Sequence, residues 1–87
     1  MTERPIRQMP GIGPTTASWL EAVDVRHESE LREIGAIEAY WRLKHRDPRR
    51  VSLNALWCLH AAIEAIPMRA VGAETKARLR AALAAKT

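Results

Sequence analysis

The sequence predicts an all-α fold of about five short helices in an orthogonal array. Apolar residues recur at spacings of three and four, which is the period of an amphipathic helix. No stretch alternates Val, Ile or Thr with polar residues, and the chain contains no phenylalanine, so no strand is expected. Prolines and glycines fall between the apolar segments, where they begin and end helices.

The first three expected helices have clear boundary signals. Pro14 suits the first turn of a helix at 15–22, because proline lacks the N–H group that would be unpaired there. Gly35 separates a second helix at 29–34 from a third at 36–45, since glycine tolerates the left-handed conformation at a helix C-terminus.

Two further helices follow the turn and stop signal of residues 47–48. Ser52 is a natural N-cap for the apolar segment 53–66. Because apolar residues cover more than one face of this helix, we expect it to be central and buried, with the other helices packed around Trp57. The fifth helix is expected at 73–85.

Length and composition indicate a small globular protein. The 87 residues suit one domain, 1–87, whose small core makes a partner or a second copy useful for stability. The hydrophobic content of 47% is too high for a disordered chain. No apolar run reaches the roughly 20 residues of a membrane span, so no membrane contact is expected. The one cysteine, Cys58, cannot form an internal disulfide, which favours a cytoplasmic location.

The net charge of +4 is unevenly distributed. Residues 1–40 contain seven acidic and four basic side chains, whereas residues 41–87 contain three acidic and ten basic ones. Such an asymmetry indicates an anionic partner for the basic half, or an acidic-to-basic contact between subunits. Chance on a solvated surface is the alternative explanation.

The segment MPGIGPTTASWL places two glycines directly before a helix. Gly11 and Gly13 permit backbone angles that are closed to other residues, and the following helix offers free N–H groups. In one interpretation this is a phosphate-binding hairpin like those of helix-hairpin-helix DNA-binding modules, with Thr15 as a further contact. In the other it is a tight corner that lets two helices touch. Such hairpins usually carry Lys or Arg after the second glycine, and the Pro14 and Thr15 found here favour the structural corner.

A wider resemblance covers nearly the whole chain. Three motifs carry it, in the order MPGIGPTTASWLEAVDV, ELREIGAIEAYWRLK and VSLNALWCLHAAIEAI. With these motifs, residues 6–83 resemble the C-terminal domain of the TfoX (Sxy) family of bacterial regulators of DNA transformation, or competence. The resemblance implies a helix-hairpin-helix-like N-terminal part, a stand-alone copy of the domain, a bacterial origin and a link to competence-gene regulation. It carries over no catalytic residues.

The basic run RLKHRDPRR is the strongest candidate for binding the backbone phosphates of DNA. The alternative is a solvated helix end, because cations also favour a helix C-terminus. The predicted nucleic-acid contacts are three residues of the corner and five basic residues of the run: Gly11, Gly13, Thr15, Arg42, Lys44, Arg46, Arg49 and Arg50.

Aromatic and reactive side chains give no sign of catalysis. Trp19, Trp41 and Trp57 lie at apolar helical positions, so we expect core packing rather than base stacking, with Trp41 as the best candidate for a partner interface. Cys58 and His60 are two residues apart on a helix and point to different faces, so they cannot form a dyad. No catalytic motif or metal-ligand spacing is present. We therefore expect no enzyme activity, metal, cofactor or small-molecule substrate.

Two functions remain open from the sequence. In the first, the protein is a DNA-associated regulatory module that contacts phosphates with little sequence preference. In the second, it is a protein-interaction module without nucleic-acid contact, most simply a homodimer. The two halves of opposite charge would then meet across subunits, or an apolar patch around Trp41 would be covered. The family resemblance favours the first function.

Overall fold

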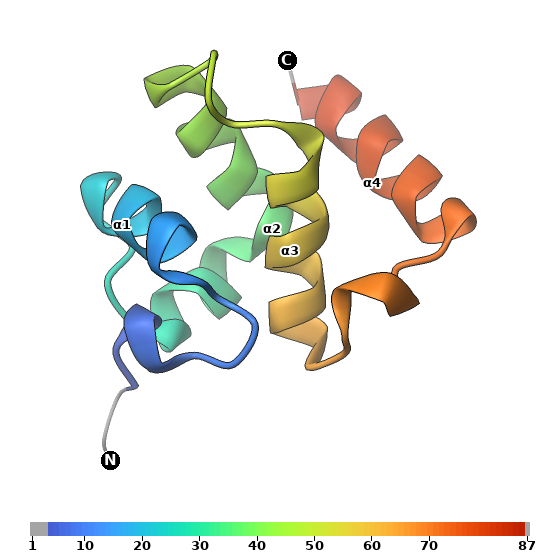
Figure 1. Ribbon diagram of the computed structural model, residues 1–87. Coiled ribbons are helices and arrows are strands. Elements are labelled where there is room, and N and C mark those ends of the chain that lie inside the picture. Colours follow the sequence, from blue (N-terminus) through green and yellow to red (C-terminus); the bar gives the residue numbers. More distant parts are fainter. Residues whose placement is uncertain (1–3, 87) are drawn as a thin grey trace.

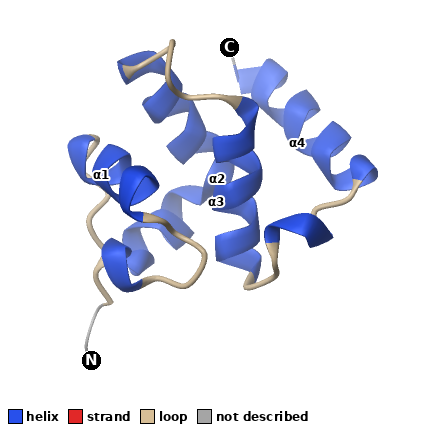
Figure 2. Cartoon of the chain, viewed as in Figure 1, coloured by secondary structure: helices blue, strands red, loops and turns tan. Residues whose placement is uncertain are grey.

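The computed structural model describes residues 4–86, and this part of the chain is helical throughout, with connecting loops and no strand (Figure 1, Figure 2). The elements are η1 (Ile6–Gln8), α1 (Pro14–Ala22), α2 (Glu28–Arg46), α3 (Leu53–Glu64), η2 (Met68–Ala70) and α4 (Ala73–Lys86), where η denotes a single 3-10 turn. The all-α prediction is therefore confirmed. No helix in the described part is long and apolar enough to cross a membrane.

Helix α2 covers both of the helices expected at 29–34 and 36–45. Gly35 has φ 83° and ψ 167°, which is not a helical conformation, so α2 is kinked into two halves at this residue. The break falls at the predicted glycine, but the helix resumes at the next residue. Because the two halves on either side of Gly35 are counted as one kinked element, the described part has four α-helices instead of the expected five.

Helix α3 is the most buried element and packs mainly against α2. Its buried residues are Ala55, Leu56, Trp57, Leu59, Ala61 and Ala62. Trp57 is only 8% exposed, so its predicted burial is confirmed. Ser52 is the N-cap as predicted, although its hydroxyl makes no capping hydrogen bond. The helix ends earlier than expected because Ala65 adopts a left-handed conformation with φ 58°.

The N-terminal segment is joined to the start of α2 by backbone hydrogen bonds. The Ile6 N–H donates to the Arg26 carbonyl at 2.8 Å, and the Glu28 N–H donates to the Arg4 carbonyl at 2.8 Å. The Ile6 side chain is fully buried, and burial of this kind stabilises the fold by about 1.5–3 kcal/mol. These contacts hold η1 against the core.

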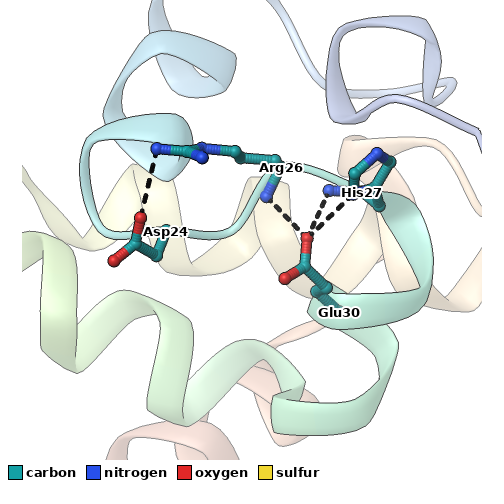
Figure 3. A network of polar contacts seen from close by, with 4 residues as sticks. All are labelled: Asp24, Arg26, His27 and Glu30. Carbon is teal, nitrogen blue, oxygen red and sulfur yellow. Dashed lines mark hydrogen bonds and ion pairs between the residues drawn. The ribbon is translucent and has the colours of Figure 1, made fainter.

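A capping box fixes the first turn of α2 (Figure 3). Glu30 Oε1 accepts hydrogen bonds from the backbone N–H groups of Arg26 and His27 at 3.0 and 2.9 Å, and it lies 3.1 Å from His27 Nδ1. These contacts, led by the Arg26 N–H, hold the pKa of the Glu30 carboxyl below its ordinary value of 4.5. The Arg26 guanidinium pairs with Asp24 at 3.2 Å in the turn before the helix.

Helix α4 lies outside the core, on the opposite side of α3 from α1 (Figure 1). None of its residues is buried, and Leu79 and Leu83 reach the core only as half-buried side chains. Lys76 Nζ lies 5.5 Å from the centre of the Trp57 ring, a cation–π contact that covers the indole. Helix α4 is therefore held against the core by the cation–π contact of Lys76 as well as by the side chains of Leu79 and Leu83.

Candidate nucleic-acid interface

Gly11 and Gly13 have different roles in the corner before α1. Gly11 has φ +91°, and a Cβ at this position would lie 3.3 Å from the Cβ of Ala62 on α3. Glycine is therefore needed here both for the backbone conformation and for the close approach. Gly13 has φ −80° and open space around it, so the expectation that it also needs a special backbone angle is wrong. The geometry at Gly11 is that of a tight corner packed on α3.

A thiol connects this corner to α3. Cys58 Sγ donates a hydrogen bond to the Gly11 carbonyl at 3.2 Å. Burial raises the pKa of the Cys58 thiol, and a contact with the Thr16 side chain partly offsets this effect. The hydrogen bond of this thiol thus links the corner to α3. Within the described part of the chain, no three His, Cys, Asp or Glu side chains are placed to hold a metal ion.

Thr15 and Thr16 occupy the first turn of α1. Pro14 begins the helix, and the Ala17 N–H is bonded to the Gly13 carbonyl at 2.9 Å. The N–H groups of Thr15 and Thr16 precede the first intrahelical hydrogen bond and have no acceptor inside the helix. Thr15 is exposed, so this predicted contact residue is open to solvent at the positive end of the helix dipole.

Two of the predicted basic contact residues already have partners. Arg42 Nε donates to Glu38 Oε2 at 2.7 Å, one turn earlier on α2. Lys44 Nζ donates to the carbonyl oxygens of Pro48 and Val51 at 2.8 and 2.6 Å. Lys44 thereby holds the loop that follows α2, and its ammonium group is turned toward protein instead of solvent.

Arg46, Arg49 and Arg50 form a second group, here called the arginine cluster. All three residues are exposed. Arg50 has a long contact with Asp47, with 3.9 Å between Nε and Oδ2, whereas Arg46 and Arg49 have no ionic partner in the described part of the chain. Arginine is the side chain best suited to phosphate, because its planar guanidinium donates two parallel hydrogen bonds. The cluster therefore retains most of its capacity to bind an anion.

Two cavities border Trp19, one next to Arg46 and one next to the first turn of α1. One cavity of about 350 Å³ is lined by Trp19, Leu43, Arg46, Asp47 and Val51. A second cavity of about 230 Å³ is lined by Thr16, Trp19, Ser52, Asn54 and Ala55. Trp19 lines both cavities, and Val51 is followed directly by Ser52 in the chain. The two cavities lie between α1, the end of α2 and the start of α3 and share Trp19; together they are here called the Trp19 groove.

Comparison with known proteins identifies the family. Residues 2–83 match the family described as the TfoX C-terminal domain. The chain belongs to this family. A crystal structure of an uncharacterized protein from Listeria monocytogenes, in a triclinic form, has the same fold. It superimposes with a TM-score of 0.79 over 87% of this chain and 85% of that one, at 24% sequence identity. No curated protein matches the sequence.

Trp41, the predicted interface residue, is half-buried within this TfoX C-terminal domain. Its ring centre lies 4.1 Å from that of His45, at an angle of 35°. On the side of α4, Lys86 Nζ lies 5.4 Å from the centre of the Trp41 ring and also pairs with Glu38. The Lys86 and Arg42 contacts, in that order, lower the pKa of the Glu38 carboxyl. Trp41 thus contacts another part of its own chain.

Trp19 is the groove residue that sequence reasoning missed in this TfoX C-terminal domain. The apolar pattern assigns it to the core, and its ring does pack against core residues. The ring is nevertheless only half-buried and borders both cavities. One signal could have indicated this: Trp19 comes three residues after Thr16 in a helix, so the two side chains share a face.

Proposed function

We propose that this TfoX C-terminal domain is a non-catalytic regulatory module that binds nucleic acid through backbone phosphates. The observation that carries the proposal is the arginine cluster, whose three exposed guanidinium groups have at most one long ionic contact in the described part of the chain. Arg46 lines one of the two cavities of the Trp19 groove and Thr16 lines the other. The cluster and the first turn of α1, two elements suited to phosphate, therefore border cavities that share Trp19.

The acidic residues of the first half weigh less against this proposal than the sequence indicates. The Glu21 carboxylate accepts two hydrogen bonds from Arg7, each at 3.0 Å. Glu28 lies 3.1 Å from Arg4 and 2.9 Å from Arg32. Exposed pairs of this kind add little to stability, but they neutralise charge locally. The repulsion that these carboxylates exert on a phosphate chain is correspondingly weaker.

Phosphate binding by three arginines predicts a characteristic salt dependence. Each phosphate neutralised on duplex DNA adds about −0.9 to the slope of log K against log salt, so the arginine cluster accounts for a slope of about −3. Phosphates carry no sequence information, and the expected binding shows little sequence preference. A role in competence-gene regulation and a cytoplasmic location belong to the same proposal, supported by the family and by the single cysteine.

Fluorescence anisotropy with a short labelled DNA duplex tests the proposal. At about 50 mM salt, where phosphate contacts are strong, the wild-type protein should bind. Replacing all three residues of the arginine cluster by glutamine should weaken binding more than about tenfold and remove most of the salt slope.

A matched control removes the same amount of positive charge from residues that line neither cavity. It combines three substitutions of exposed arginines on η2 and α4: Arg69→Gln, Arg78→Gln and Arg80→Gln. This control should weaken binding less than about threefold, because only the long-range field changes. Equal losses in the two triple variants would show attraction by net charge without a site. A wild-type protein that does not bind at low salt would refute the proposal.

A homodimer without nucleic-acid contact is the second candidate function. It is supported by Ile66 and Met68, large hydrophobic residues that are 38% and 39% exposed in the segment between α3 and α4. A second copy that covered both side chains would remove this apolar surface from water. Light scattering over a range of micromolar concentrations tests this candidate, and a strict monomer throughout that range would eliminate it.

A further inference from the structure

The Trp19 groove combines three kinds of chemical group. The half-buried Trp19 ring lines both cavities, with Ser52 and Asn54 in the smaller one and Arg46 in the larger one. The larger cavity, about 350 Å³, falls within the range of roughly 300–1,000 Å³ that is usual for ligand pockets. Apolar walls with a few converging polar groups are the usual composition of such pockets.

Several polar groups of the groove are unused by the protein. The Trp19 indole N–H, the Ser52 hydroxyl and the Asn54 amide make no hydrogen bond within the described part of the chain. Ser52 is notable because, as the N-cap of α3, its hydroxyl would ordinarily accept a bond from the first helical turn. An aromatic ring flanked by free donors and acceptors suits a flat heterocycle that stacks on the ring and hydrogen-bonds through its edge.

The positive charge next to the groove further limits the class of ligand that fits it. Arg46 lines the groove, and Arg49 and Arg50 follow in the chain, so a ligand that joins a heterocycle to phosphates complements the whole surface. We propose that the Trp19 groove takes an unstacked base of single-stranded nucleic acid, with the arginine cluster on the adjoining phosphates. A paired duplex cannot enter in this way, because its base faces are stacked on one another. This inference rests on the proposed function of the arginine cluster and specifies the form of nucleic acid.

Asp47 is the one acidic residue that lines the groove within the described part of the chain, and its position is compatible with this ligand. Its Oδ1 accepts the Arg50 N–H at 3.4 Å, and its Oδ2 lies 3.9 Å from Arg50 Nε, which offsets its charge. A carboxylate also accepts hydrogen bonds from the exocyclic amino group of a base such as cytosine. The phosphates would then lie toward Arg46 and Arg49, away from the carboxylate.

Binding of two labelled probes of equal length, a single strand and a duplex, tests the inference at about 50 mM salt. Trp19→Leu keeps an apolar side chain but removes the stacking surface, so it should weaken single-strand binding by about 5- to 100-fold. Duplex binding should change less than about twofold, since phosphate contacts are intact. Single strands should also quench tryptophan fluorescence in the wild type and not in this variant.

Trp41→Leu is the matched control, because Trp41 contacts α4 and is absent from the lining of both cavities. It should leave binding of both probes unchanged. Asn54→Ala provides a second test on an exposed side chain, in case Trp19→Leu does not fold by circular dichroism. It should weaken single-strand binding by about 2- to 10-fold, as expected for one hydrogen bond.

The outcomes separate the two proposals. Single-strand binding that is unchanged in folded Trp19→Leu and in Asn54→Ala overturns the groove assignment, and so does an equal loss for both probes. The phosphate-binding function survives either result. If the wild type binds neither probe in a salt-dependent manner, the proposed function itself fails. Selective loss of single-strand binding in the two groove variants supports the inference.

Discussion

Replacing Gly11 by alanine should destabilise the protein by about 2–3 kcal/mol. The backbone φ of +91° costs a residue with a side chain about 1–2 kcal/mol. The new Cβ would lie 3.3 Å from Ala62 Cβ and 3.4 Å from Ala62 Cα. Ala62 is only 5% exposed on α3 and has little room to move, so mild overpacking adds about 1 kcal/mol.

Urea unfolding followed by circular dichroism measures this loss directly. For a domain of this size, 1 kcal/mol corresponds to a shift in Tm of roughly 4–8 °C. In a thermal melt, the Gly11→Ala variant should therefore unfold about 8–24 °C below the wild type. The packing of Gly11 against Ala62 also positions the Gly11 carbonyl, which accepts the hydrogen bond from the Cys58 thiol. The thiol should therefore become more accessible in this variant.

Gly13→Ala is the matched control, since Gly13 has φ −80° and no neighbour within 4 Å of the added Cβ. The substitution restricts the unfolded chain, which stabilises by about 0.4–1 kcal/mol, but alanine is the poorer N-cap by a similar amount. We expect a net change within about 0.5 kcal/mol. If both glycine variants lost the same stability, or neither did, the argument that Gly11 closes the corner against α3 would be refuted.

Three further predictions concern other contacts. Lys44→Met should lower the free energy of unfolding in urea by about 1–2 kcal/mol, because it removes two charge-assisted hydrogen bonds to loop carbonyls. The control Arg49→Met loses no partner in the described part of the chain and should change this free energy by less than about 0.5 kcal/mol. Equal losses in the two variants would contradict the role of Lys44 in holding the loop. The pKa of Glu30 is lowered in the folded protein, so its stabilising contribution is present above the ordinary pKa of 4.5 and is lost as the pH falls through the folded value. Glu30→Gln should therefore melt lower than the wild type at neutral pH and lose less Tm on acidification, and parallel pH profiles would count against the capping box. Since the pKa of Cys58 lies above its ordinary value of 9.0, alkylation at neutral pH should be slower than for a cysteine peptide and should recover in urea, whereas peptide-like reactivity in the folded protein would show an activated thiol.

Helix boundaries that depend on local chemistry could be predicted from the sequence. Pro14 begins α1 and Ser52 occupies the N-cap position of α3, as expected. The break at Gly35 was also predicted, and the helical conformation ends there and resumes at the next residue. The single turns η1 and η2 have three residues each, which is too short for an apolar period to show.

The site was predictable only where partners are close in sequence. The pairing of Arg42 with Glu38 follows from their spacing of four residues on a helix. The engagement of Lys44 depends on the path of the loop to Val51, which no local pattern specifies. The Trp19 groove requires three separate elements to meet, so it exists only in the folded protein.

The kink at Gly35 has a geometric consequence for the two ends of α2. Residues before it are bonded to the N-terminal segment, whereas residues after it lead to Arg46. The direction of the second half of α2, which ends at Arg46, therefore depends on the dihedral angles of this one residue. With φ 83° and ψ 167°, Gly35 lies in a region almost restricted to glycine. Any other amino acid at position 35 would be strained in this conformation, so its substitution should alter the angle between the two halves of α2 without removing a side chain that lines the groove.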